Sequence, residues 1–247
     1  MNKIVEQKRS SALTDAGTDT FYACAICQSL APCHACIITP EQTGICGNYN
    51  WHTARAVSER EPYGPFSPIT KGEPLDAGRG QWRDVNEYFR KISYGRIKQV
   101  NLYSLMHAPP TACILSEAVT AVLPGCNGVM TVNRGYKGET PGGFTYGKLL
   151  EIVRGGEQTP GFIGHAVSAI TQENFLKAEG GLLRLVWMPR KLKEEIGERI
   201  TACARALGVP DLPAKIADET AGITEETVLP FLREKGHPAL TMKPILE

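Results

Sequence analysis

Five of the eight cysteines of this chain lie within the 23 residues from Cys24 to Cys46. Four of them, Cys24, Cys27, Cys36 and Cys46, follow the spacing C-x2-C-x8-C-x9-C. Four thiolates can hold either a tetrahedral zinc ion or a 4Fe-4S cube. A structural zinc ribbon usually pairs two CxxC motifs, and this segment has a single one. The spacing therefore favours an iron–sulfur cluster over zinc.

The same cysteines could instead form disulfide bonds, act as a redox-active pair or be free thiols packed in the core. A chain of 247 residues buries enough surface to be stable without disulfides. The N-terminus has no apolar signal segment, which predicts a cytoplasmic protein whose thiols stay reduced. A thioredoxin-like pair is disfavoured because no strand is expected before the CxxC motif and further cysteines crowd it. Thiols that are merely packed stay open as an alternative.

Two further cysteines could contribute to the same chemistry. Cys33, inside the cluster, is either a spare exposed thiol or a ligand to a second metal. Cys113 lies in "HAPPTACILSEA", after one expected strand and before an expected helix. A helix N-terminus lowers the pKa of a thiol, so Cys113 is placed like a reactive or metal-binding thiolate, with a buried structural cysteine as the alternative. We expect His34 to hydrogen-bond a cluster sulfur or the backbone, because the thiols around it suit soft metals better.

The overall composition limits the kinds of partner. The net charge is +1, with 42% hydrophobic and 21% charged residues, as is ordinary for a globular protein. No basic stripe is present, so neither a nucleic acid nor an anionic membrane surface is expected as a partner. No window approaches 18 apolar residues, so no membrane-spanning segment is predicted.

The elements that must position the cysteines belong to one predicted domain over residues 1–247. It consists of a cluster-binding segment (20–60), a long irregular Pro/Gly-rich loop (60–82) and an α/β core (99–247). Strands are predicted at 99–105, 128–134 and 182–189, with helices at 116–123, 148–155, 171–181, 190–207 and 224–236. A helix between the first two strands implies that they are parallel. The predicted fold is α/β, a mixed and largely parallel sheet flanked by helices, with a cysteine-rich N-terminal segment.

Several uncommon strings occur together in one order. They include "CQSLAPCHACIITPEQTGICG", "LPGCNGVM", "GGEQTPGFIG", "GGLLRLVWMP" and "EKGHPALTM". From about residue 20 to the end, the chain resembles the C-terminal, A-cluster-bearing domain of acetyl-CoA synthase. The equivalent in archaea is the β subunit of the acetyl-CoA decarbonylase/synthase complex.

This resemblance implies a site and an activity. The cube ligands of the family correspond to Cys24, Cys27, Cys36 and Cys46, with Cys27 as the thiolate that bridges to a proximal nickel. Two more cysteine sulfurs of the family join the proximal nickel to a distal one. The family condenses CO, a methyl group from a corrinoid iron–sulfur protein and coenzyme A, so a corrinoid protein or another redox partner and a small gas or methyl ligand are expected.

The sequence departs from the family at three places. The family has Cys-Gly-Cys where this chain has Cys113, Ile114 and Leu115. The distal nickel needs two thiolates and two backbone amides in a square plane, so we expect no distal nickel. A single proximal nickel, or another metal, could still bind Cys27 and Cys113, with a third ligand from Cys33, water or substrate. Leu30 replaces the usual aromatic residue, which changes the shape of a small-gas pocket. The chain also begins just before the cluster motif, so we expect it to lack the family's domains for the CO-producing partner and coenzyme A.

Two functions follow from these expectations. In the first, the protein is an iron–sulfur enzyme of CO or methyl-group chemistry that resembles the acyl-transferring acetyl-CoA synthase without its distal nickel. Cys27 and Cys113 are then the catalytic residues, because they hold the reactive metal. In the second, it is a non-catalytic 4Fe-4S protein that transfers electrons to a corrinoid protein or docks with it.

Overall fold

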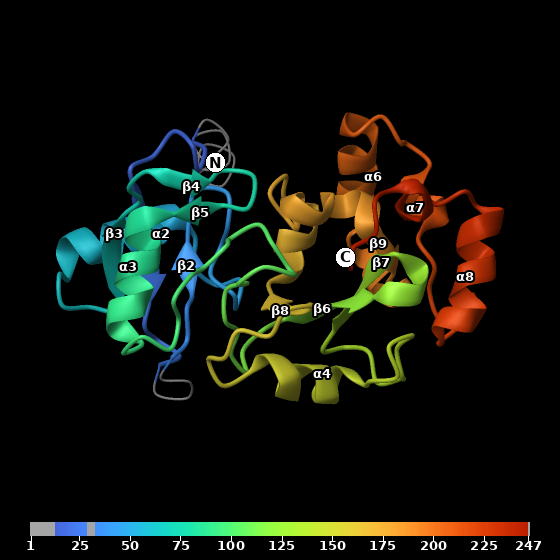
Figure 1. The fold of residues 1–247 in the computed structure, drawn as a ribbon, viewed down its shortest axis with the longest axis horizontal. Helices are drawn as coiled ribbons and strands as arrows, with labels where there is room; N and C mark the ends of the chain where they lie inside the picture. Colours follow the sequence, from blue (N-terminus) through green and yellow to red (C-terminus); the bar gives the residue numbers. More distant parts are fainter. Residues whose placement is uncertain (1–12, 29–32, 247) are drawn as a thin grey trace.

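The computed structural model describes residues 13–28 and 33–246, and these residues form two halves that lie side by side (Figure 1). The half nearer the N-terminus contains a three-stranded antiparallel sheet of order β2-β1-β3 and a two-stranded sheet, β4-β5. Its elements, in chain order, are β1 (Thr20–Cys24), β2 (Ile37–Ile38), α2 (Trp51–Arg60), β3 (Phe66–Thr70), β4 (Pro74–Asp76), β5 (Gln81–Trp82) and α3 (Arg83–Ile92).

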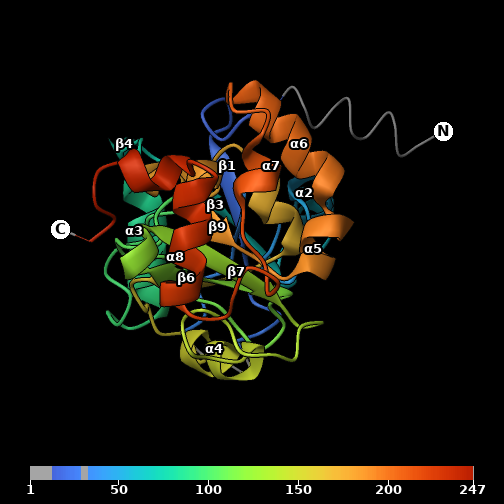
Figure 2. The same cartoon turned by 90° about the vertical axis from the view of Figure 1, so that its right-hand side faces the viewer.

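The second half is built on a four-stranded sheet of order β8-β6-β7-β9, with helices around it (Figures 1 and 2). Its strands are β6 (Ala118–Leu123), β7 (Gly128–Asn133), β8 (Phe162–His165) and β9 (Leu185–Trp187). Its α-helices are α4 (Tyr146–Val153), α5 (Arg190–Glu195), α6 (Gly197–Ala206), α7 (Leu212–Lys215) and α8 (Glu225–Glu234). Short 3-10 turns are η1 (Pro124–Cys126), η2 (Val167–Thr171), η3 (Lys177–Glu179), η4 (Gly181–Arg184) and η5 (Pro238–Thr241).

The predicted α/β class with a mixed sheet, flanking helices and a cysteine-rich segment at its N-terminal side is confirmed. The proportion of parallel pairs is lower than expected, because β7 and β9 are parallel while β6 pairs antiparallel with both β7 and β8. The expectation of one domain over residues 1–247 stays a prediction.

The predicted helix at 116–123 is wrong, because most of this segment is strand β6. Three β-branched residues, Val119, Thr120 and Val122, favour the extended backbone. Between β6 and β7 the chain turns through η1 to Asn127, which takes a left-handed conformation with φ 48°. The two strands form a hairpin, and the parallel pair inferred from a crossover helix does not exist.

Two further predictions fail in the first half. The segment 60–82 is not an irregular loop, since it contains β3, β4 and β5. Pro68 is accommodated because β3 is an edge strand that pairs with β1 alone in its sheet. The predicted strand 99–105 is a series of turns with an isolated bridge between Asn101 and Gln81. The backbone N–H of Asn101 donates instead to the carbonyl of Ala108 (2.7 Å).

The predicted helices have mixed outcomes. Strand β7 and helix α4 lie where the sequence places them, and β9 occupies the middle of the predicted strand 182–189. Residues 171–181 form short 3-10 turns rather than a helix, and the helix predicted over 190–207 is interrupted at Ile196. Helix α8 begins after Thr224, whose side chain accepts a hydrogen bond from the Thr227 backbone N–H, and it continues through Pro230 without splitting.

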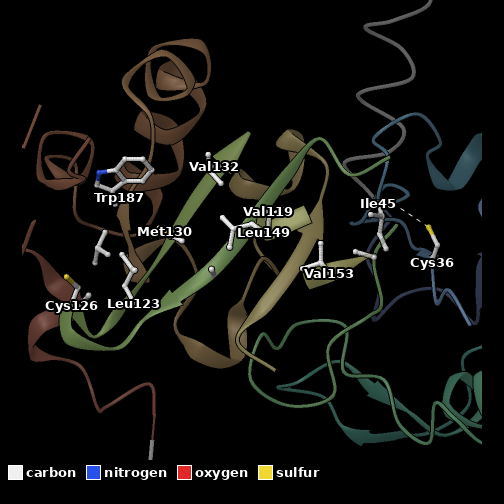
Figure 3. Close-up of a cluster of buried hydrophobic side chains, with 14 of the residues drawn as sticks. Cys36, Ile45, Val119, Leu123, Cys126, Met130, Val132, Leu149, Val153 and Trp187 are labelled. Carbon is white, nitrogen blue, oxygen red and sulfur yellow. Dashed lines mark hydrogen bonds between the residues drawn. The ribbon is translucent and has the colours of Figure 1, made fainter. Parts of the chain in front are cut away.

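The largest hydrophobic core crosses from one half to the other. It joins Tyr22, Cys36 and Ile45 of the first half to residues of the β6–β9 sheet such as Val119. Figure 3 shows Cys36 and Ile45 at one end of this core and Cys126 towards the other. The cysteine segment is therefore packed against the sheet by apolar contacts. In the part of the chain that the structure describes, no helix has the length and apolarity that crossing a bilayer requires.

Candidate metal centre

The first pair of cysteines is positioned by strands. Strand β1 ends at Cys24, so a strand does precede the CxxC motif, contrary to expectation. The backbone N–H of Cys24 donates to the carbonyl of Cys36 (2.9 Å), just before β2 pairs with β1. Backbone pairing therefore holds these two cysteines next to each other.

The neighbouring loop contributes a polar contact to the same pair and a further thiol beside it. The backbone N–H of Ile45 donates to the Cys36 sulfur at 3.5 Å. Cys46 follows at once, and the charges of both Cys24 and Cys113 influence its ionisation. Cys46 is thus near enough to Cys24 and Cys113 for their charges to interact, and a cube held by these cysteines stays a prediction.

A second pair of sulfurs is formed across a long sequence separation. The sulfur of Cys27 lies within 4.8 Å of the sulfur of Cys113, which is 86 residues further along the chain. Both are buried, with 6% of Cys27 and 1% of Cys113 exposed to solvent. The two sulfurs are close enough to bind one metal ion, and their sharing one stays a prediction.

The pKa values of these thiols show how far their ionisation depends on a balancing positive charge. Burial, followed by the hydrogen bond with Cys113, raises the pKa of Cys27 to about 12. The contact with Cys36 lowers the pKa of Cys24 to about 7, and the same contact together with burial raises that of Cys36 well above its usual value. Burial also raises the pKa of Cys46. Several thiolates can coexist here when a bound cation balances their charge, so the donor set fits a metal or metal cluster.

The Cys113 segment has no helix after it, so the expected helix-dipole effect on this thiol is absent. A tight turn holds it instead, in which both the backbone N–H and the hydroxyl of Ser116 donate to the Cys113 carbonyl (3.1 and 2.9 Å). Gly164 of β8 lies directly beneath this turn. A Cβ at that position would come within 2.4 Å of the Ser116 hydroxyl and 2.7 Å of the Ala112 Cβ. The turn can therefore approach the sheet because residue 164 has no side chain.

The two residues after Cys113 offer no second thiolate at this place. Ile114 and Leu115 are 44% and 42% exposed, while Cys113 beside them is buried. Arg134 fixes the backbone here by donating to the carbonyls of Leu115 (3.2 Å) and Ser116 (3.1 Å). Neither exposed side chain carries an atom that could ligate a metal. The predicted change at Leu30 lies outside the described residues.

His34 lies beside the sulfurs of Cys27 and Cys113. A ring nitrogen of His34 and the sulfurs of Cys27 and Cys113 all lie within 4.8 Å of one another, and all three residues are buried. Nδ1 of His34 lies 3.4 Å from the Thr111 hydroxyl, which also accepts a hydrogen bond from the Ala35 backbone. Burial lowers the pKa of His34 to about 4, opposed by a hydrogen bond with the Ala112 backbone. Its position inside the string "CHAC" was the signal that could have identified it.

The remaining cysteines lie apart from this group. Arg96 donates to the sulfur of Cys33 (3.4 Å), which is partly exposed. Cys126 is buried in the core next to helix α8, where burial raises its pKa to about 12. Cys203 packs against the second core from a partly exposed position and donates to the Thr171 carbonyl (3.2 Å). These contacts hold both thiols by packing, away from Cys27 and Cys113.

Known proteins of similar sequence share one family. The family model for the C-terminal part of the ACS/CODH beta subunit matches residues 5–246. The alpha subunit of carbon monoxide dehydrogenase/acetyl-CoA synthase from Moorella thermoacetica is 45% identical over 96% of this chain and 33% of its own length. The beta 2 subunit of the acetyl-CoA decarbonylase/synthase complex from Methanocaldococcus jannaschii is 39% identical over 94% of this chain and 48% of its own.

A solved structure supports the same relation. The C-terminal domain of the acetyl-coenzyme A synthase alpha subunit is 43% identical, with a TM-score of 0.52 over 55% of this chain and all of that one. The present chain spans between a third and a half of the two curated relatives described above. With a family match over nearly its whole length, this chain belongs to the family of C-terminal domains of acetyl-CoA synthase/carbon monoxide dehydrogenase β subunits.

Proposed function

We propose that this chain is an iron–sulfur protein of CO or methyl-group chemistry. Cys24, Cys27, Cys36 and Cys46 would hold a 4Fe-4S cluster, for which four thiolates are the usual ligands. The observation that carries the proposal is that these thiols and Cys113 come from two distant segments into one group, which is buried except for the partly exposed Cys46. A cluster of this kind requires reduced thiols, which supports a cytoplasmic location.

A second metal would be held by Cys27 and Cys113. When bound, this metal would supply a site at which CO or a methyl group can coordinate, next to a cluster that tunes its electronic properties. The protein's own contribution is to bury both sulfurs and to keep bulk water from them. Because the free thiol of Cys27 has a raised pKa, binding of either metal releases its proton to solvent. No distal nickel is proposed, since residue 115 is Leu rather than Cys.

A second candidate function is electron transfer to a protein partner or docking with it. Three exposed apolar side chains, Ile26, Ile114 and Leu115, flank the Cys27–Cys113 contact, and each is between 41% and 44% exposed. Apolar residues around a redox centre are suited to a protein partner that must approach closely. A corrinoid protein would fit either candidate, and the relatives whose names place them in a multi-protein complex support the expectation of protein partners.

Metal analysis after anaerobic purification tests the first claim. We expect about four iron and four sulfide ions per chain, as a 4Fe-4S cube requires. Cys24→Ala should lose most of the iron, whereas the matched control Cys203→Ala should keep it. Retention of the iron in Cys24→Ala would remove the proposed ligand set.

The response to CO separates the two candidate functions. In the enzyme-like case, CO changes the electron paramagnetic resonance spectrum of the wild type, and Cys113→Ala loses this change while keeping its iron. In the electron-transfer case, CO has no effect on either protein. A CO response that survives in Cys113→Ala would contradict the proposed second metal site.

A further inference from the structure

One buried polar side chain at the metal centre is not used by the proposed cube. His34 is 2% exposed, and its ring lies against the two sulfurs of Cys27 and Cys113. Among residues 13–28 and 33–246, this trio is the group of three Cys, His, Asp or Glu side chains whose ligating atoms are close enough to share a metal ion. The trio joins two segments, because Cys113 lies 79 residues after His34.

The backbone beside His34 holds the ring at this place. Gly156, with φ +81°, lies against the Cys33–His34 peptide, and a Cβ there would approach the His34 nitrogen to 2.9 Å and the Cys33 carbonyl carbon to 2.7 Å. Thr111 contacts the ring itself, and its hydroxyl also accepts a hydrogen bond from the Ala35 backbone. The imidazole thus has a neighbouring group that can fix its orientation, as ligating histidines usually have.

Cys33, the other residue considered as a third ligand, contacts a different side chain. The sulfur of Cys33 accepts a hydrogen bond from Arg96 at a partly exposed position and does not belong to the trio. Leu115, at the place of the missing thiolate, carries no donor atom and is exposed. His34 is therefore the described side chain that can complete the coordination begun by Cys27 and Cys113.

We propose that His34 is the third protein ligand of a divalent metal ion of the zinc–nickel class held by Cys27 and Cys113. The donor set is two thiolates and one imidazole, with a fourth position left open for a small ligand. This inference rests on the proposed function in one respect, because Cys27 is also assigned to the cube.

The charge and the donor types both favour this arrangement. Two thiolates and a neutral imidazole balance a divalent ion without excess charge, which matters in a site that is almost fully buried. Two sulfurs and one nitrogen with an open position are also a known ligand set of catalytic zinc. The imidazole thus replaces the absent thiolate with a donor that borderline metals accept.

X-ray absorption at the zinc or nickel edge tests the proposal on the anaerobically reconstituted full chain, with iron counted separately. The wild type should hold one such ion per chain, with two sulfurs at about 2.3 Å and nitrogen at about 2.0 Å. His34→Ala should lose the nitrogen and bind the ion at least ~10-fold more weakly. His34→Cys should restore binding with three sulfurs, and the exposed control His52→Ala should match the wild type.

The outcomes distinguish this inference from the proposed function. A nitrogen signal that persists unchanged in His34→Ala, or a sulfur count of two in His34→Cys, overturns the assignment of His34. A wild type that holds iron but takes up no zinc or nickel overturns it as well, while the cube stands. A wild type that takes up zinc or nickel but no iron overturns the cube and leaves the His34 site intact. If His34→Ala does not fold, His34→Cys decides alone through its sulfur count.

Discussion

The two cysteine-bearing segments are held in place by different means. Cys24 and Cys36 are fixed by the backbone, since their residues pair at the junction of β1 and β2. Cys113 is fixed by neighbours that are distant in sequence, among them Gly164 beneath its turn and Arg134 on the following carbonyls. Regular secondary structure can thus build the cluster half of the centre. The half that would carry reactivity depends on tertiary packing and should be easier to disturb.

Acid should produce the largest effect, and it should act on the Cys113 segment through the strand next to it. The backbone carbonyl of His165 in β8 accepts a hydrogen bond from the backbone N–H of Glu117, close to the Cys113 turn. Burial lowers the pKa of His165 to about 4, so the folded protein keeps it neutral while the unfolded chain takes up a proton below about 6.5. Stability conferred by this group is present above pH 6.5 and is lost as pH falls towards 4, by up to about 3 kcal/mol.

Urea unfolding measured at several pH values checks this expectation. His165→Gln should flatten the dependence of the unfolding free energy on pH between 6.5 and 4. The same slope in the variant and the wild type would mean that other groups cause the acid sensitivity. Buried His34 and His237, whose pKa values are also lowered to about 4, add to the effect in both proteins.

Gly164→Ala should have the next largest effect and should act on one segment alone. The new Cβ would force the Ala112–Ser116 turn away from the sheet, at a cost of about 1–3 kcal/mol in unfolding free energy. We expect uptake of the second metal to fall while iron content stays at the wild-type level. Gly197→Ala is the matched control, because a Cβ there meets nothing within 4 Å. Equal loss of iron and second metal would show that the two segments are not independent.

Restoring the family motif should sharpen the comparison with little change in the fold. Ile114→Gly and Leu115→Cys alter two exposed side chains and return a second thiolate and a flexible residue beside Cys113. Nickel per chain, measured after reconstitution, should rise above that of the wild type. Ile114→Gly alone is the control for backbone freedom. Unchanged nickel in the double variant would mean that the lost distal site is not at this position.

Cys33→Ser should have the smallest effect. The Cys33 sulfur contacts Arg96 at a partly exposed position, so its loss should change the unfolding free energy by less than ~0.5 kcal/mol. Iron and second-metal contents should both match the wild type. A fall in either content would make Cys33 a ligand, which is the alternative that the sequence left open.

The local sequence pattern predicted some helices and strands correctly and others wrongly. Helix α8 with its Thr224 cap, helix α4 and strand β7 could all be predicted, because caps and apolar spacing act over a few residues. The helix predicted at 116–123 failed because a short apolar segment does not distinguish helix from strand until its neighbours are known. Here the left-handed turn at Asn127 lets β6 fold back onto β7.

The sequence by itself determined the family, the class of fold and a cysteine spacing that suits a four-thiolate cluster, because these follow from residue types and their separation. The tertiary structure decided which distant side chains meet. Contact of Cys27 with Cys113, and the place of His34 against both, depend on glycines at 156 and 164 that let separate loops approach one another. Close packing between segments brings these side chains together, and the distance between them along the sequence does not predict that contact.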